Sequence, residues 1–171
     1  MTVSRPVLPL IAIAAAGAVL AGCATGPSTG GYGGGSEFNA DAFAWSARPG
    51  QGVIQGRVAY VRDGQTFNCI GNAGLIPDTA YTRARMQRLY GSTDRADVPA
   101  AVVRARSAGE QGADYRSYER AEACTDNAFR FSGLPDGSWF IITPVRADGD
   151  PVVLMRHVIT RGGRQVSVTL G

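Results

Sequence analysis

Short runs of apolar and β-branched residues, some of them alternating with polar residues, occupy much of the chain beyond residue 52. Alternation places successive side chains on opposite faces and predicts a strand with one buried face, and a short apolar run between turn residues also predicts a strand. The expected strands cover residues 53–61, 73–76, 100–106, 129–131, 138–145, 152–160 and 165–170. Turn residues such as Asp63–Gly64 and Gly162–Gly163 separate them. Several short strands divided in this way predict an all-β sandwich.

Pro144 falls inside the expected strand 138–145. Proline has no N–H to donate to a neighbouring strand, so sheets place it at an edge or at the end of a strand. We therefore expect this strand to lie at an edge or to end near Pro144.

A helical period replaces the alternation over residues 79–90. Thr82, Met86, Leu89 and Tyr90 would share one face, which predicts a single short helix. Gly91 follows at the position where a C-cap glycine belongs. Arg85 and Arg88 would lie on another side of the same helix.

The first 23 residues carry a different pattern. Arg5 precedes an apolar run over residues 7–20, which suits the core of a signal peptide and is short of the roughly 20 residues that cross a bilayer. The run ends in Leu-Ala-Gly-Cys at Cys23, which resembles the lipobox of bacterial lipoproteins. This resemblance implies removal of residues 1–22 and anchoring in membrane lipid through acyl chains on Cys23. An unlipidated secreted protein and a transmembrane helix are the alternatives.

Ala24 follows the cysteine. In Gram-negative lipoproteins an Asp at this place resembles an inner-membrane retention signal, so Ala24 favours the outer membrane, with the chain in the cell envelope and facing the periplasm. Residues 23–36 then form the lipidated cysteine and a flexible Gly/Ser-rich tether. Residues 37–51 are a lead-in segment, in which Phe43 and Trp45 form a short strand or dock the tether onto the core. Residues 52–171 form the folded domain.

The two remaining cysteines are Cys69 and Cys124. An even pair in an exported chain predicts a disulfide, which would stabilise the fold by roughly 4 kcal/mol in the chain-entropy model. Two free buried thiols, or half of a metal site, are the alternatives. Two cysteines without a nearby histidine make a poor zinc site.

Two segments resemble the carboxypeptidase regulatory-like domains. The first runs from Gly56-Arg57-Val58 to Leu75-Ile76-Pro77-Asp78-Thr79-Ala80-Tyr81, and the second covers residues 125–139, with Phe129, Phe131, Leu134-Pro135-Asp136-Gly137 and Trp139. The resemblance implies a transthyretin-like Greek-key β-sandwich of about seven strands, with the helix near residues 79–90 added. Ala128 stands where that family usually has Gly. Phe129, Phe131 and Trp139 are expected in the core.

Few residues in the sequence suggest a catalytic or binding role. The chain has 17 basic and 14 acidic residues, with no basic stripe carrying aromatic residues, so we expect no nucleic-acid partner. His157 is the only histidine, and it falls inside the expected strand 152–160, so we expect it to be structural or on the outer face. The C-terminus Ser167-Val168-Thr169-Leu170-Gly171 lacks the ending typical of transthyretin-like hydroxyisourate hydrolases. We predict no catalytic, cofactor or metal residue.

Two groups of charged residues have weaker functional interpretations. Asp136, Asp148 and Asp150 stand in turns and could gather calcium, but Asp is also a common turn residue. The arginines near the helix, Arg83, Arg85, Arg88 and Arg95, could meet anionic lipid head groups.

These observations favour a non-enzymatic, membrane-anchored lipoprotein that presents a β-sandwich interaction module in the cell envelope. Its partner would be an envelope protein or a glycan. An accessory subunit that positions an envelope enzyme or transport system is the alternative, and a small-molecule hydrolase is a weaker one.

Overall fold

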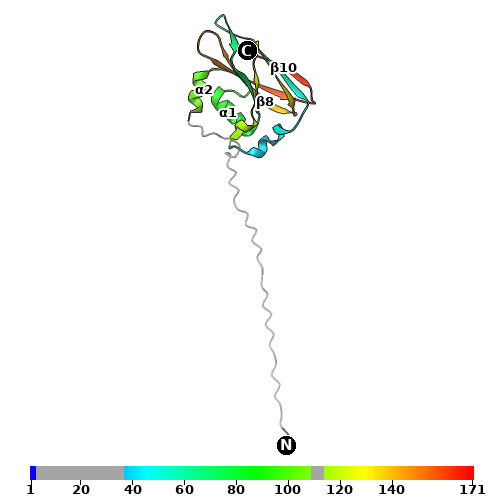
Figure 1. Cartoon of the computed structure of the whole chain (residues 1–171). Coiled ribbons are helices and arrows are strands. Elements are labelled where there is room, and N and C mark those ends of the chain that lie inside the picture. Colours follow the sequence, from blue (N-terminus) through cyan, green and yellow to red (C-terminus); the bar gives the residue numbers. More distant parts are fainter. Residues whose placement is uncertain (3–36, 109–113) are drawn as a thin grey trace. The chain divides into compact units, whose positions relative to one another are not determined.

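The computed structural model describes residues 1–2, 37–108 and 114–171, and the folded domain lies within the unit Tyr32–Gly171. Two β-sheets dominate this domain (Figure 1). The described residues contain ten strands: β1 (Gly52–Val58), β2 (Tyr60–Arg62), β3 (Gln65–Cys69), β4 (Asn72–Pro77), β5 (Arg95–Pro99), β6 (Arg120–Ala123), β7 (Ala128–Leu134), β8 (Gly137–Arg146), β9 (Val152–Thr160) and β10 (Gln165–Leu170). The expected all-β sandwich is confirmed, with ten strands in place of about seven.

The smaller sheet has the strand order β10-β1-β7. β1 runs parallel to β10 and antiparallel to β7. One face of this sheet is buried, through residues such as Ile54, Phe129 and Phe131, while Gln55, Arg57 and Arg130 on the other face are exposed.

The larger sheet is built around β8. This strand pairs with β9 along one side and with β4 and then β3 along the other. β5 continues the sheet beyond β9, β6 beyond β4, and β2 beyond β3. β8 is therefore a central strand and not an edge strand, but it ends at Arg146, two residues after Pro144, which agrees with the other expected position for this proline. Pro144 is tolerated because it lies where β8 changes partner from β4 to β3, and its carbonyl accepts a hydrogen bond from Ile70 N in the turn between them, at 2.9 Å.

The inner faces of the two sheets enclose the first of two cores. Phe129 and Phe131 of β7 and Trp139 of β8 are buried, as the family resemblance implied, and Leu134 of β7 is buried with them. The indole N–H of Trp139 donates to Thr160 Oγ1 at 3.1 Å, so its polar atom is satisfied inside the core.

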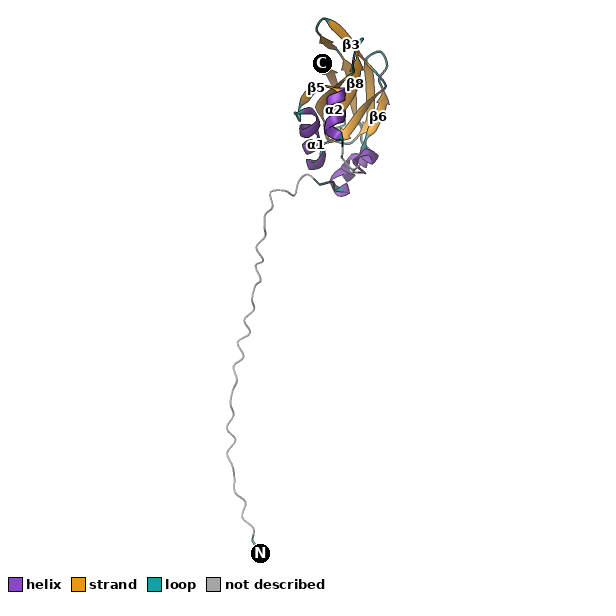
Figure 2. Ribbon diagram, turned by 90° about the vertical axis from the view of Figure 1, so that its left-hand side faces the viewer, coloured by secondary structure: helices purple, strands orange, loops and turns teal. Residues whose placement is uncertain are grey.

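The second core lies on the other face of the larger sheet, under two α-helices (Figure 2). α1 (Ala80–Tyr90) covers the predicted helix, buries Thr82, Met86, Leu89 and Tyr90 as expected, and is closed by Gly91 in the left-handed conformation, with φ 74°. These side chains pack with Ile76, Phe140 and Met155 of the sheet.

α2 (Ala100–Ser107) occupies the segment for which the alternation predicted a strand. The prediction of a strand over 100–106 is wrong. The segment is rich in alanine and arginine, which are strong helix formers, and its alternation is only three or four residues long. Arg106 of α2 donates to the Leu89 carbonyl in the last turn of α1 at 2.7 Å, which joins the two helices.

The lead-in segment belongs to the folded domain. Residues Ala40–Ala47 form a 3₁₀-helix, η1, so the short strand proposed for Phe43 and Trp45 is wrong. The docking alternative is correct, because Phe43 is fully buried and the Trp45 ring packs edge-on against Trp139 with centroids 4.8 Å apart. A second 3₁₀-helix, η2 (Asp114–Tyr118), lies against η1 through Phe43 and Tyr118.

The expected disulfide joins Cys69 at the end of β3 to Cys124, with Cα atoms 6.1 Å apart. Asp126 and Asn127 form the left-handed turn that follows, with φ 51° and 61°, so the family's Gly position at Ala128 is not needed for the turn. Asn127 Oδ1 accepts from Cys69 N at 2.8 Å, which ties this turn to β3. Cys23, the expected lipidation site, lies outside the described residues. Within those residues, no helix combines the length and apolar character needed to cross a membrane.

Candidate functional site

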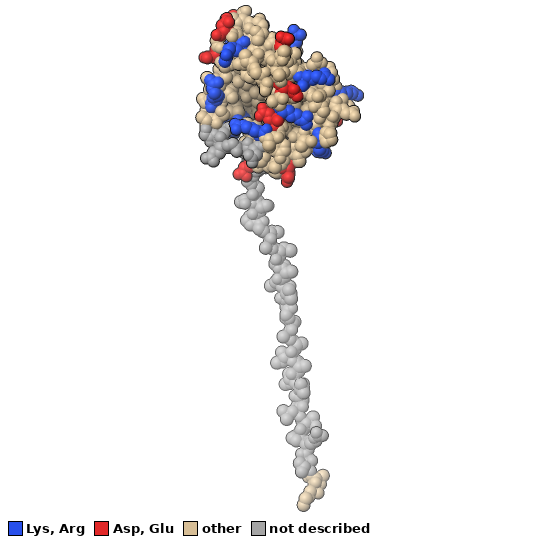
Figure 3. Space-filling model, in the orientation of Figure 1, with Lys and Arg blue, Asp and Glu red and all other residues tan. Residues whose placement is uncertain are grey.

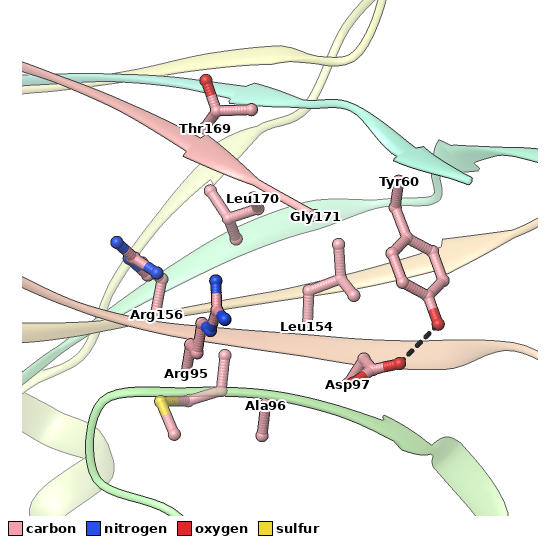
Figure 4. A pocket seen from close by; sticks show the side chains of 10 residues that line it. Tyr60, Arg95, Ala96, Asp97, Leu154, Arg156, Thr169, Leu170 and Gly171 are labelled. Carbon is pink, nitrogen blue, oxygen red and sulfur yellow. Dashed lines mark hydrogen bonds between the residues drawn. The ribbon is translucent and has the colours of Figure 1, made fainter. Parts of the chain in front are cut away.

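A cavity of about 330 Å³ opens at the side of the sandwich where β10 ends one sheet and β5 ends the other. Figure 4 shows the side chains that line it. Those used below are Tyr60, Arg95, Asp97, Leu154, Arg156 and Leu170, and we call this cavity the Tyr60–Asp97 pocket. Its volume is at the small end of the range for ligand pockets in proteins, about 300–1,000 Å³.

Tyr60 reaches the pocket because the chain changes sheets next to it. β1 ends at Val58 in the smaller sheet and β2 begins at Tyr60 in the larger one. Ala59 between them donates its N–H to the Leu170 carbonyl of β10 at 2.8 Å. The crossing therefore places Tyr60 beside the end of β10 and close to β5.

The Tyr60 hydroxyl donates to Asp97 Oδ2 at 2.6 Å. The ring is buried and packs edge-on against Phe67, with centroids 5.1 Å apart. Burial first, and then the Asp97 carboxylate, raise the pKa of the Tyr60 phenol above its ordinary value. Tyr60 is thus a neutral hydrogen-bond donor that fixes the carboxylate of Asp97, which lies on an exposed stretch of β5.

Two arginines lie across from each other at the opposite end of the pocket. Arg95 of β5 pairs directly with Arg156 of β9, which places both side chains on the same face of the sheet. Within residues 37–108 and 114–171, neither guanidinium has a carboxylate within 4.0 Å or a side-chain hydrogen bond. Figure 4 shows both guanidinium groups directed toward the end of β10, away from the Tyr60–Asp97 pair.

Leucines separate the two polar ends. Leu154 is the β9 partner of Asp97, and Leu170 approaches from β10 on the other sheet. Both belong to the core between the sheets and are almost fully buried. The pocket therefore has an apolar floor, a hydroxyl–carboxylate pair at one end and two guanidinium groups at the other.

His157 does not take part in this pocket. It follows Arg156 on β9, and the alternation of the strand directs it to the helix-covered face, where its ring packs against Phe140 at 5.1 Å. Its Nε2 lies 2.9 Å from Oδ2 of Asp78, which also contacts Arg83. A structural role for His157 thus agrees with its place in the fold.

The helix arginines do not form a common cationic face. Arg85 is buried, and its guanidinium lies 5.0 Å from the centroid of the Tyr115 ring, so the idea that it meets lipid head groups is wrong. Arg83 is engaged with Asp78, Arg88 is exposed on α1, and Arg95 belongs to the pocket. On the face seen in Figure 3, basic and acidic side chains are interspersed.

One of the three turn aspartates has a structural role, and the other two are exposed. Asp136 accepts hydrogen bonds from the backbone N–H groups of Gly162 and Gly163, at 2.7 and 3.3 Å, and so braces the β9–β10 turn. Across the described part of the chain, no three His, Cys, Asp or Glu side chains gather in a way that could hold a metal ion.

The sequence alone did not identify the pocket. Tyr60 lay in an expected strand, but residues 95–99 had no predicted element. The spacing Arg95-x-Asp97 would place both side chains on one face of a strand, which is the one local signal present. The partner of that face, β9, and the approach of β10 are set by tertiary structure.

Neither a family model nor a curated protein sequence matches this chain. Among solved structures it is similar to a crystal structure from Pseudomonas aeruginosa described as a "putative carbohydrate binding protein", with a TM-score of 0.52 and 19% sequence identity. The match covers 80% of this chain and 98% of the other. A likeness at this identity shows that the two chains share a fold.

Proposed function

We propose that this protein is a lipid-anchored module of the bacterial cell envelope that binds carbohydrate in the Tyr60–Asp97 pocket. The anchor is Cys23, within a sequence that resembles a lipobox. The proposal combines this membrane location with the pocket of the β-sandwich. The fold of the domain is shared with a protein described as a "putative carbohydrate binding protein".

The proposal depends mainly on how polar and apolar groups are arranged in the pocket. A sugar ring presents hydroxyl groups around its edge and C–H groups on its faces. Asp97 can accept hydrogen bonds from hydroxyl groups, and the guanidinium groups of Arg95 and Arg156 can donate to them. Leu154 and Leu170 lie between these polar groups at the floor of the pocket. A concave site in which a few polar groups converge is typical of small-molecule binding.

Binding without hydrolysis fits the groups present. Glycosidases generally use two carboxyl groups that flank the scissile bond. Asp97 is the only acidic side chain that lines the pocket in the described part of the chain. Tyr60 does not supply a phenolate nucleophile at neutral pH, because its pKa lies above the ordinary value.

A glycan array probed with the full-length protein in detergent tests this function. Binding to a defined subset of sugars is expected. The Asp97→Asn variant should weaken that binding by about tenfold or more, because a hydrogen bond to a charged group contributes roughly 1.5–3 kcal/mol. Asp148→Asn, in an exposed turn, is the matched control and should bind as the wild type does.

Two outcomes contradict the proposal. One is an array without any bound sugar, and the other is binding that Asp97→Asn leaves unchanged. Crosslinking in intact cells adds an independent check. A single envelope enzyme as the dominant partner, in place of polysaccharide, would favour the accessory-subunit alternative.

A further inference from the structure

We infer that the sugar bound in the Tyr60–Asp97 pocket is acidic, and that Arg95 and Arg156 together hold its carboxylate, phosphate or sulfate group. This inference rests on the proposed carbohydrate function and specifies the chemical class of the ligand. It follows from the position of two arginines that have no carboxylate within 4.0 Å among the described residues.

The pairing of Arg95 with Arg156 is unfavourable in the absence of a ligand. Residues directly opposite each other on antiparallel strands have Cβ atoms about 4.5–5.5 Å apart, and like charges at such positions destabilise a sheet. The register is fixed by four further pairs between β5 and β9, from Ala96–Met155 to Pro99–Val152. The strands therefore cannot relieve the repulsion by slipping one residue, because this would expose the apolar residues that face the helices.

Asp97 does not neutralise the two arginines. It lies two residues beyond Arg95 on the same face, and its carboxylate accepts the Tyr60 hydroxyl at the other end of the pocket. The side chains that line this concave site thus include two guanidinium groups and one carboxylate, and neither guanidinium group is paired with that carboxylate. A ligand with an anionic group at one end and hydroxyl groups at the other matches this distribution.

The type of cation also points to an oxyanion. The guanidinium group is planar, stays charged at any physiological pH and matches carboxylate and phosphate groups with paired N–H donors. Two such groups on neighbouring strands can bind one oxyanion from two directions. An apolar floor at Leu154 then lies between the anion and the hydroxyl-binding pair.

Calorimetric titration of the full-length protein in detergent tests the inference with matched sugars. The probes are glucose and galactose, their uronic acids, and the phosphate and sulfate esters of glucose. At least one acidic sugar should bind about tenfold or more tightly than its neutral parent, since hydrogen bonds between charged groups are worth roughly that factor each. Comparison of the uronic acids with the esters identifies which oxyanion is preferred.

Substitutions at the two arginines test whether they cause the preference for acidic sugars. Arg95→Gln and Arg156→Gln should abolish the preference for the acid, so that the acidic sugar binds no more tightly than its neutral parent, because the charge that distinguishes the two sugars is lost. Arg57→Gln, an exposed residue on the outer face of β1, is the matched control. The melting temperature of the unliganded Arg156→Gln variant should equal or exceed that of the wild type, because a like-charge pair is removed.

Failure of this inference can be told apart from failure of the proposed carbohydrate function. Equal affinity for neutral and acidic sugars, both weakened by Asp97→Asn, would overturn this inference and leave the carbohydrate function standing. Binding of no sugar at all would overturn both. If inorganic phosphate, sulfate or acetate bound as tightly as the acidic sugars, the site would be a simple anion site and the inference would be wrong. A fall in melting temperature in both arginine variants, without any change in binding, would assign the pair a structural role.

Discussion

At the scale of single residues, hydrogen bonding decides whether a buried hydroxyl stabilises the domain. Thr82 and Thr143 are both fully buried. Thr82 Oγ1 donates to the Pro77 carbonyl at 2.7 Å and accepts from Thr79 N at 2.8 Å, which closes the capping box of α1. Thr143 Oγ1 has no hydrogen-bond partner among the described residues.

The same isosteric change should therefore have opposite effects at these two positions. Thr82→Val is expected to lower the free energy of unfolding by about 1–3 kcal/mol, because it leaves the Thr79 N–H and the Pro77 carbonyl without their partner. Thr143→Val should be neutral or stabilising, because it removes an unpaired buried hydroxyl. Denaturant unfolding monitored by tryptophan fluorescence measures both. A Thr143→Val variant as unstable as Thr82→Val would contradict this account.

The environment of each residue in the Tyr60–Asp97 pocket is also set by neighbours that are remote in sequence. The hydroxyl of Tyr60 is paired with a carboxylate 37 positions away, and its pKa is raised chiefly because the phenol is buried. Arg95 and Arg156 meet only because β5 pairs with β9. These contacts give the pocket its two chemically different ends.

At the scale of elements, η1 is joined to the sandwich by aromatic packing. The Trp45 ring lies directly over Gly137 at the start of β8, so that a methyl group at this glycine would overlap the indole ring. Trp45 then contacts Trp139 two residues further along β8. The absence of a side chain at Gly137 is what allows this close approach.

Gly137→Ala is expected to destabilise the domain by about 1–3 kcal/mol, the usual cost of forcing extra volume into a packed site. Gly149→Ala is the matched control, because nothing lies within 4 Å of the added methyl group there. Thermal unfolding followed by circular dichroism compares the two variants. Equal melting temperatures would mean that Trp45 moves aside without cost and that η1 contributes little to the core.

At the scale of the whole molecule, the domain has three layers. The helices cover one face of the larger sheet, and the smaller sheet covers the other. The proposed binding pocket opens at the side where β5 and β10 end the two sheets, so a ligand can enter without disturbing either core. A short tether from Cys23 would keep this pocket near a membrane surface.

The proposed anchor predicts where the protein is found in the cell. Cys23→Ser should shift it from the membrane fraction to the soluble fraction, because serine has no thiol to accept the diacylglyceryl group and two acyl chains are needed for stable anchoring. The Cys69→Ser/Cys124→Ser double variant is the control, and any folded protein it yields should stay in the membrane fraction. Fractionation followed by immunoblotting gives the result, and a Cys23→Ser protein that remains membrane-bound would refute the anchor.

The sequence by itself determined the features that depend on neighbours in the chain. An apolar run over 152–160 marked β9, alternation over 165–170 marked β10, a helical period marked α1, and the pair Asp63–Gly64 marked a hairpin turn. The buried Phe129, Phe131 and Trp139 could also be predicted, because their pattern resembles that of a known sandwich family.

Tertiary structure decided the rest. α2 and η1 were misassigned because short alternating stretches are compatible with either helix or strand until packing selects one. Pro144 could enter a central strand only because β8 exchanges partners there. The pocket depends on strand order, since β5, β9, β2 and β10 bring its residues together from separate parts of the chain. No local pattern encodes that order, because it is fixed by which buried faces pack together.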